Sequence, residues 1–240
     1  MRLSGDYWLL NKPIAHRGLW GGDIVENSLS AYKNAVNNGF PIEIDLYSSC
    51  DGVLFSFHDQ TLERMTGKKG LIFEKSSQEL LSTKLIGSNE SIPTFDQVLE
   101  VVDGKVPLLI ELKDQPDKTY VDRVVERLKS YKGEFAIQSF NPLYIKRVKK
   151  LAPNFIRGIL GTKTHSKELP FIKRKIVSNM LLNFLIKPDF ISYSFEDLPL
   201  KKHKIKKLPV ITWTITDCEC AKKVKPFAKN IIFEHFVPTK

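Results

Sequence analysis

Eight short apolar runs, spread along the whole chain with helix-like stretches between most of them, constrain the fold more than any other feature of this sequence. The runs are Pro13–His16, Ile42–Leu46, Pro107–Leu112, Phe135–Ser139, Phe155–Leu160, Asp189–Ser194, Pro209–Ile215 and Asn230–Phe233. Buried strands have this length and character, and strands that alternate with helices are typical of parallel sheets linked by crossovers. The simplest closed arrangement is a TIM (β/α)₈ barrel, and a doubly wound open sheet is the alternative.

Five stretches between these runs have apolar residues at helical spacing. The first, Ser28–Asn38, ends before Gly39, a residue that often stops a helix. Its Leu29, Tyr32 and Ala35 share one face. The other four stretches are Thr94–Val102, Lys118–Tyr131, Pro142–Leu151 and Phe171–Ile186. We expect helices over these ranges.

A ninth run, Val53–His58, does not fit the alternation. It follows Ile42–Leu46 after only a few residues, whereas a parallel crossover needs about a dozen or more. The two runs are therefore predicted to pair antiparallel, and the Asp-Gly pair at 51–52 between them is a strong hairpin turn signal.

The register of this hairpin follows from its turn. If the turn pairs Cys50 with Val53, Asp45 falls opposite His58. The hairpin would then place an imidazole beside a carboxylate at one end of the barrel.

The segment after the hairpin, residues 60–92, reads as polar and loop-like, and it is too short for an independent domain. A chain of 240 residues is long for one ordinary domain, yet barrels regularly reach this size as a single unit. We expect one domain over residues 1–240, with 60–92 as a rim or lid insertion.

Polar side chains end several of the predicted strands, and the site of a barrel lies at the C-terminal ends of its strands. These candidates are His16 and Arg17, Glu43 and Asp45, His58, and Glu111 and Lys113. Because strand side chains alternate, Glu43 and Asp45 face one side, as do Glu111 and Lys113.

This set of residue types predicts a site for a phosphate ester. Glu43, Asp45 and Glu111 would repel one another at one barrel mouth unless a cation lay between them. Oxygen-only ligands favour a hard ion, Mg²⁺ or Ca²⁺, over zinc. Arg17, Lys113 and such an ion would neutralise phosphoryl charge, and the two histidines would move protons near neutral pH.

The charge of the chain is unevenly distributed. Residues 1–140 contain 16 basic and 20 acidic residues, a net −4, whereas residues 141–240 contain 21 and 7, a net +14. A basic half can indicate nucleic acid, an anionic membrane, an anionic substrate, or simply a solubilising surface. The most basic run, 201–207, has no interleaved aromatic residues, so we interpret it as a solvated face rather than a nucleic-acid site.

Several classes of protein are excluded by what the sequence contains. Three cysteines are too few for a disulfide framework, and the pair Cys218 and Cys220 alone is no zinc signature. No run approaches the ~20 apolar residues of a membrane span, and the N-terminus lacks a secretory apolar region. We expect a soluble, cytoplasmic protein.

Seven motifs occur in a fixed order: IAHRGLWGG, VENS, IEIDL, FSFHDQTLERMTG, LLIELK, FAIQSFNP and VITWTI. The ordered set spans about residues 13–216 and resembles the glycerophosphodiester phosphodiesterase family. The resemblance implies a TIM-barrel hydrolase of lipid and glycerol metabolism, which cleaves glycerophosphodiesters to glycerol 3-phosphate and an alcohol.

The resemblance also implies roles for individual residues. His16 and His58 match the catalytic histidines, and Glu43, Asp45 and Glu111 match the metal carboxylates. The residues that match substrate-binding positions are Arg17, Lys113, Glu26, Asn27, Gln138, Ser139, Phe140 and Trp213. Which histidine is the acid stays open, and the nucleophile is either the neighbouring glycerol hydroxyl, which the family favours, or a water molecule.

Two other functions remain as alternatives. A lysophospholipase D or sphingomyelinase D-like barrel would share this chemistry and differ in the pocket for the alcohol. A non-catalytic phosphate-binding barrel would be favoured if a histidine or a metal carboxylate had been lost, and none has been.

The stretch Phe171–Ile186 has a possible second role. It is most simply a helix that covers the barrel. Its second half is apolar nearly all round, and basic residues lie at 173–175 and 201–207. The helix could therefore rest on an anionic bilayer and make the protein peripheral. The oligomeric state cannot be predicted from the sequence.

Overall fold

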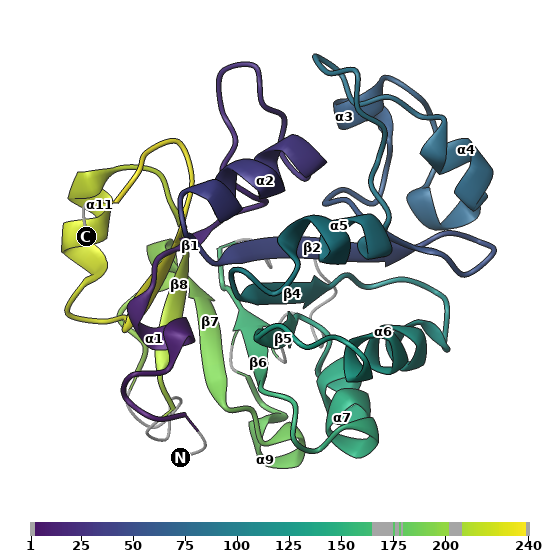
Figure 1. Ribbon diagram of the computed structural model, residues 1–240. Helices are drawn as coiled ribbons and strands as arrows, with labels where there is room; N and C mark the ends of the chain where they lie inside the picture. The colour runs from purple at the N-terminus through teal and green to yellow at the C-terminus, as the bar shows by residue number, and fades with distance from the viewer. Residues whose placement is uncertain (1–2, 165–174, 176–177, 179, 202–207, 239–240) are drawn as a thin grey trace. The chain divides into compact units, whose positions relative to one another are not determined.

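The protein is described by a computed structural model over residues 3–164, 175, 178, 180–201 and 208–238. Its elements, which Figure 1 labels, fall into two compact units. One comprises residues 15–135, and the other comprises residues 1–14 and 136–240.

Strands β1 (Ile14–Ala15), β2 (Ile42–Ser48) and β4 (Leu108–Leu112) form the parallel sheet of unit 15–135. β1 enters it through Ala15, which is paired with Ile42. Every residue of β2 and β4 is buried, as expected for parallel strands covered on both faces. The apolar runs that form β2 and β4 therefore lie at the centre of this unit.

Helices α2 (Leu29–Asn37) and α5 (Phe95–Val102) pack against each other beside this sheet (Figure 1). Ser28 caps α2 by accepting from the N–H of Ala31. α5 begins with a capping box between Thr94 and Gln97. A third helix, α6 (Tyr120–Lys129), follows β4. These helices occur where the apolar periodicity predicts them.

Strand β3 (Leu54–Ser56) pairs antiparallel with β2, as predicted, but the expected register is wrong by one residue. Tyr47 pairs with Phe55, and the N–H of Phe57, not of His58, donates to the carbonyl of Asp45. The reason is a three-residue turn over residues 50–52 in place of a two-residue one. Ser49 closes this turn through its bonds to Val53, and Gly52 supplies the positive φ of 91°.

Residues 60–92 are more ordered than a polar loop. They contain α3 (Glu63–Thr66), the 3₁₀ turn η1 (Ile72–Glu74) and α4 (Ser77–Leu81). The segment shares a small apolar core with the hairpin, made of Tyr47, Phe55, Phe57, Leu62, Ile72, Leu80, Leu85 and Ile92. The insertion is therefore fastened to the hairpin by buried side chains.

Five strands form the parallel sheet of the second unit, in the order β5–β6–β7–β8–β9. They are β5 (Phe135–Ser139), β6 (Arg157–Gly161), β7 (Phe190–Ser194), β8 (Val210–Ile215) and β9 (Asn230–Phe233). The helical elements around them are α1 (Trp8–Asn11), α7 (Pro142–Leu151), α9 (Asn183–Ile186), η2 (Phe195–Asp197) and α11 (Cys218–Val224). The amide of Asn230 ties β9 to the N-terminal segment by donating to the carbonyls of Leu9 and Lys12.

All nine predicted strands are present, and their order is that of a TIM (β/α)₈ barrel with an added β-hairpin after the second strand. The fold class that the sequence predicts is thereby confirmed. Of the predicted helix Phe171–Ile186, residues 171–174, 176, 177 and 179 lie outside the described residues, as do residues 202–207 of the basic run. In its described part, Met180 has a φ of 51° and is followed by a turn, and α9 begins only at Asn183, so the expected helix is wrong over residues 180–182. Within the described part of the chain, no helix has the length and apolar character needed to cross a bilayer.

Candidate active site

Three carboxylates meet where β2 and β4 run side by side. The strand register pairs Asp45 with Glu111, and Glu43 lies two residues before Asp45 on the same face of β2. One oxygen from each side chain lies within 4.8 Å of the others, and all three residues are buried. Strand alternation and the parallel pairing of β2 with β4 together place these acids side by side.

Lys113 lies against this cluster. Its Nζ is 2.9 Å from Oδ1 of Asp45 and 2.7 Å from Oε1 of Glu111. Burial alone would lower the pKa of Lys113, but the two carboxylates raise it above its usual range. The ammonium therefore stays charged and offsets part of the repulsion among the acids.

The surroundings shift the pKa values of the two acids of β2, Asp45 and Glu43, in opposite directions. Burial would raise the pKa of Asp45, but Lys113, His58 and Arg17 together lower it. Burial and the neighbouring carboxylates raise the pKa of Glu43 well above its usual range.

This donor set suits a hard divalent cation. The converging ligands are all carboxylate oxygens, they are buried, and burial together with the neighbouring carboxylates raises the pKa of Glu43. Mg²⁺ and Ca²⁺ prefer such ligands, whereas zinc sites are usually built with nitrogen or sulfur. The described residues that could hold a metal ion are Glu43, Asp45 and Glu111, the three that the sequence predicts.

His16 and Arg17 reach the cluster from the end of β1. Nε2 of His16 is 4.0 Å from Oε2 of Glu43, and the backbone N–H of Arg17 donates to the same oxygen over 3.1 Å. Arg17 has a φ of 57°, in the left-handed region, and Gly18 follows with a φ of 89°. A Cβ on Gly18 would lie 2.8 Å from the Cβ of Ala31, so α2 packs directly on this glycine.

Glu26 and Asn27 hold the same region from the loop before α2. Nη1 of Arg17 donates to Oε1 of Glu26 over 2.8 Å, and Nδ2 of Asn27 donates to Oδ2 of Asp45 over 3.1 Å. The hydroxyl of buried Tyr32 donates to Oδ1 of Asn27 over 2.7 Å. Tyr32 thus supports the site, whereas helical periodicity identifies it only as an apolar contact.

His58 follows β3 and contacts Asp59, and Asp59 in turn contacts Arg64; the sequence assigns neither of these two residues a role. Nδ1 of His58 is 2.6 Å from Oδ1 of Asp59. Arg64 of α3 binds both carboxylate oxygens of Asp59 and also Oε1 of Glu26. The signal that could have identified Asp59 is its position directly after the histidine at a strand end.

The remaining candidates lie in the second unit. Gln138 and Ser139 are buried at the end of β5. The rings of Phe140 and Trp213 meet edge to face, with centroids 5.7 Å apart. The substrate-binding role predicted for these four residues stays a prediction.

A comparison with protein families decides where this chain belongs. The family model described as "Glycerophosphoryl diester phosphodiesterase family" matches residues 16–238. The chain belongs to this family. The resemblance in the sequence is thereby confirmed over nearly its whole length.

Relatives in the family come from distant organisms. A glycerophosphodiester phosphodiesterase of Caldanaerobacter subterraneus is 32% identical over 163 residues, which cover 61% of this chain and 65% of that protein. Glycerophosphodiester phosphodiesterase 1 of Bos taurus is 23% identical over 239 residues, which cover 84% of this chain and 71% of that protein. The chain thus spans slightly less than two thirds of the Caldanaerobacter relative.

A solved structure is similar over almost the full length of both chains. It is an Oleispira antarctica phosphodiesterase in complex with the product sn-glycerol-3-phosphate, 25% identical with a TM-score of 0.78. The similarity covers 95% of this chain and 94% of the other. It supports the TIM-barrel fold of this family member.

Proposed function

We propose that this family member is a metal-dependent phosphodiesterase that hydrolyses glycerophosphodiesters to glycerol 3-phosphate and an alcohol. The observation that carries the proposal is a buried cluster of three carboxylates. One oxygen each of Glu43, Asp45 and Glu111 lies within 4.8 Å of the others, and Arg17 and Lys113 lie beside Asp45. The Oleispira antarctica phosphodiesterase holds sn-glycerol-3-phosphate, the product that this reaction would release.

The cations of the site would bind the phosphate. A phosphodiester has about one negative charge, and the guanidinium of Arg17 can donate to it from two nitrogens. Oε1 of Glu26 accepts a hydrogen bond from Nη1 of this guanidinium and so orients the group. Lys113 adds a second positive charge, next to Oδ1 of Asp45, whereas Arg17 lies next to Oδ2. Mg²⁺ or Ca²⁺ held by the three carboxylates would supply further neutralisation of phosphoryl charge.

His16 and His58 would move the protons. One imidazole accepts the proton of the attacking hydroxyl as the new P–O bond forms, and the other donates a proton to the alcohol oxygen as its P–O bond breaks. If the attacking group is the neighbouring glycerol hydroxyl, the first product is a cyclic phosphate, which water then opens to glycerol 3-phosphate. If it is water, glycerol 3-phosphate forms directly.

Release of glycerol 3-phosphate tests the proposal. The purified chain with Mg²⁺ or Ca²⁺ is incubated with glycerophosphocholine, glycerophosphoethanolamine and glycerophosphoglycerol, and the product is quantified. A parallel assay of choline release from lysophosphatidylcholine and sphingomyelin distinguishes the lysophospholipase D and sphingomyelinase D alternatives. Release only from the lipid substrates would favour those alternatives, and no release from any diester would favour the phosphate-binding barrel.

A further inference from the structure

The contact between His58 and Asp59 determines which imidazole nitrogen is free. A carboxylate only accepts hydrogen bonds, so Nδ1 of His58 must hold the proton that it donates to Oδ1 of Asp59 over 2.6 Å. In the neutral imidazole, Nε2 is then left with its lone pair. Burial would raise the pKa of Asp59, but His58 and Arg64 lower it below its usual range, so Asp59 is ionised at neutral pH.

Arg64 holds Asp59 from the insertion. Its Nε donates to Oδ2 of Asp59 over 2.5 Å, and its Nη2 donates to Oδ1 over 2.9 Å. The same Nη2 donates to Oε1 of Glu26 over 2.6 Å, and Glu26 in turn holds Arg17. A two-point contact of this kind fixes the plane of the carboxylate as well as its position.

We propose that Asp59 and Arg64 are positioning residues for His58: Asp59 holds the imidazole in the Nδ1–H tautomer, and Arg64 holds Asp59. The inference rests on the proposed function, since the proton transfer at Nε2 is what the arrangement would serve. It assigns the insertion a part in the chemistry, because α3 supplies Arg64. Leu62, just before α3, and Met65 within it pack in the core that the insertion shares with the hairpin. Partners that orient a functional histidine through its second nitrogen have this effect at many sites.

The tautomer can be measured without any assay of turnover. The protein is labelled with ¹⁵N, loaded with Mg²⁺, and its imidazole nitrogens are recorded at neutral pH. The chain contains five histidines, and the signal lost in His58→Ala identifies His58. We expect a protonated Nδ1 and an unprotonated Nε2 at His58 in the wild type, and a shift toward the Nε2–H tautomer in Arg64→Gln and Asp59→Ala. A wild-type His58 protonated at Nε2 alone would overturn the proposal.

Kinetics on the same variants test whether the positioning matters. We expect kcat to fall about 10–100-fold in Asp59→Ala and by a smaller factor in Arg64→Gln. KM should change by less than about threefold in Asp59→Ala, because Asp59 contacts His58 and Arg64 rather than Arg17 or Lys113. Arg64→Lys keeps the charge but not the two-point contact, so its kcat should lie between those of Arg64→Gln and the wild type.

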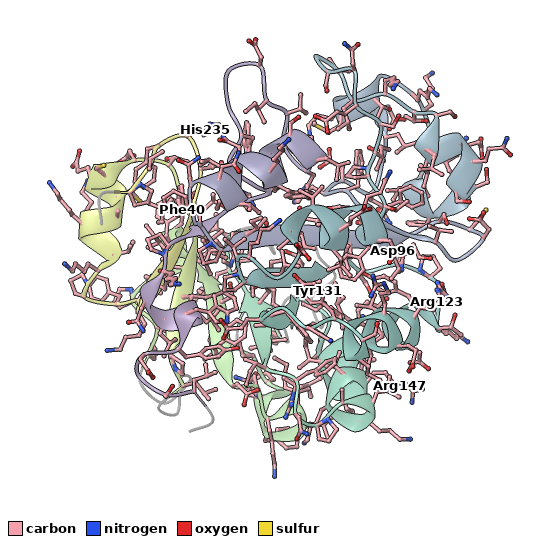
Figure 2. The ribbon with its side chains drawn as sticks, viewed as in Figure 1. Phe40, Asp96, Arg123, Tyr131, Arg147 and His235 are labelled. Atoms are coloured by element: carbon pink, nitrogen blue, oxygen red, sulfur yellow. The ribbon has the colours of Figure 1, made fainter. Side chains whose placement is uncertain are left out.

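Arg127→Gln is the matched control. Arg127 also pairs through its Nε with a carboxylate, that of Asp96 on α5, which Figure 2 labels, and its side chain is 38% exposed, against 47% for that of Arg64. If Arg64→Gln has the kcat of Arg127→Gln, the positioning role is wrong. Should Asp59→Ala fail to fold, Arg64→Gln still decides, because its exposed side chain contributes little packing.

The two proposals fail in different ways. If no diester is hydrolysed but the His58 tautomer depends on Asp59 and Arg64, the proposed function is wrong and the positioning stands as a structural finding. If diesters are hydrolysed and the tautomer is unchanged in the variants, the positioning proposal alone is overturned.

Discussion

The backbone N–H of Arg17 donates to Oε2 of Glu43 over 3.1 Å. At this bond the backbone of Arg17 is in the left-handed region, with a φ of 57°. Gly18 keeps the next turn of chain in place, with no side chain between it and Ala31 of α2. The approach of β1 to the acidic cluster is therefore set by the backbone as well as by side chains.

Gly18→Ala should destabilise the protein by about 2–5 kcal/mol, since it adds a left-handed backbone penalty to an overlap with Ala31 at 2.8 Å. Gly39→Ala is the control, because Gly39 has a similar φ of 71° and nothing within 4 Å of its Cβ position. That variant should lose only about 1–2 kcal/mol. Urea unfolding of both proteins measures the difference, and equal losses would contradict the packing argument.

His16→Ala and His58→Ala should each reduce the turnover number at least ~10²-fold, because each variant lacks one proton-transfer group. The thermal midpoint should move little, since both side chains lie around a polar site rather than in the core. Steady-state rates and thermal unfolding on the same samples test this. A variant that keeps nearly the wild-type rate would show that its histidine is not an acid or base of the reaction.

Removal of divalent cations should abolish hydrolysis, and Mg²⁺ or Ca²⁺ should restore it. Glu111→Gln should weaken this reactivation, because it takes one charged oxygen from the cluster. Glu126→Gln is the control, since Glu126 is exposed and pairs only with Lys129 in the described contacts. Full activity in excess chelator would contradict the metal assignment.

Asp51 should make stability depend on acid pH. Hydrogen bonds from Ser49 and Ser77 lower the pKa of Asp51 to about 2 from 3.8. A lowered pKa in the folded state stabilises the protein above the unfolded pKa, and this contribution is lost as the pH falls from about 4 to about 2. Asp51→Asn should therefore have a lower thermal midpoint than the wild type at pH 6, with the gap closing near pH 2. A gap that persists at pH 2 would show that the charge of Asp51 is not what stabilises the turn.

The basic half should bind anionic vesicles at low salt and be released at high salt. Two side chains of the described end of this region support the expectation, since Leu181 and Phe184 are 52% and 68% exposed. Replacing Lys173, Arg174 and Lys175 by Gln should weaken the binding. Sedimentation with phosphatidylserine vesicles measures it, and phosphatidylcholine vesicles are the control. No binding at low ionic strength would leave the basic half as a solubilising surface.

The strands and the acidic cluster could be predicted because they depend on local patterns. Each apolar run is short and ends in polar residues, and alternation alone puts Glu43 and Asp45 on one face. The cluster then needs only the parallel pairing of β2 with β4, which brings Glu111 opposite Asp45.

The hairpin register could not be predicted because it depends on whether the turn contains two residues or three. Asp51 and Gly52 suit a two-residue turn, and only the bonds of Ser49 to Val53 show that Cys50 belongs to the turn as well. His58 still lies near the cluster in the observed register, because it is one of the groups that lower the pKa of Asp45.

The order within residues 60–92 was missed for a different reason. Its buried residues, among them Leu62, Ile72 and Leu80, follow neither helical nor strand periodicity, because each comes from a different short element. Asp59 and Arg64 were missed because their contacts bridge the hairpin and the insertion, which no local pattern records.

The shared core of the hairpin and the insertion limits how this region can be exchanged between relatives. Tyr47 lies two residues after Asp45 on the same face of β2. The same face of this strand therefore supplies Asp45 to the acidic cluster and Tyr47 to the apolar core shared with the insertion. A chimaera that replaces only residues 60–92 would leave Tyr47, Phe55 and Phe57 facing foreign side chains, one step from the carboxylates. The natural unit of exchange is therefore the hairpin together with its insertion, and a change of substrate range by swapping this segment would have to start at β2.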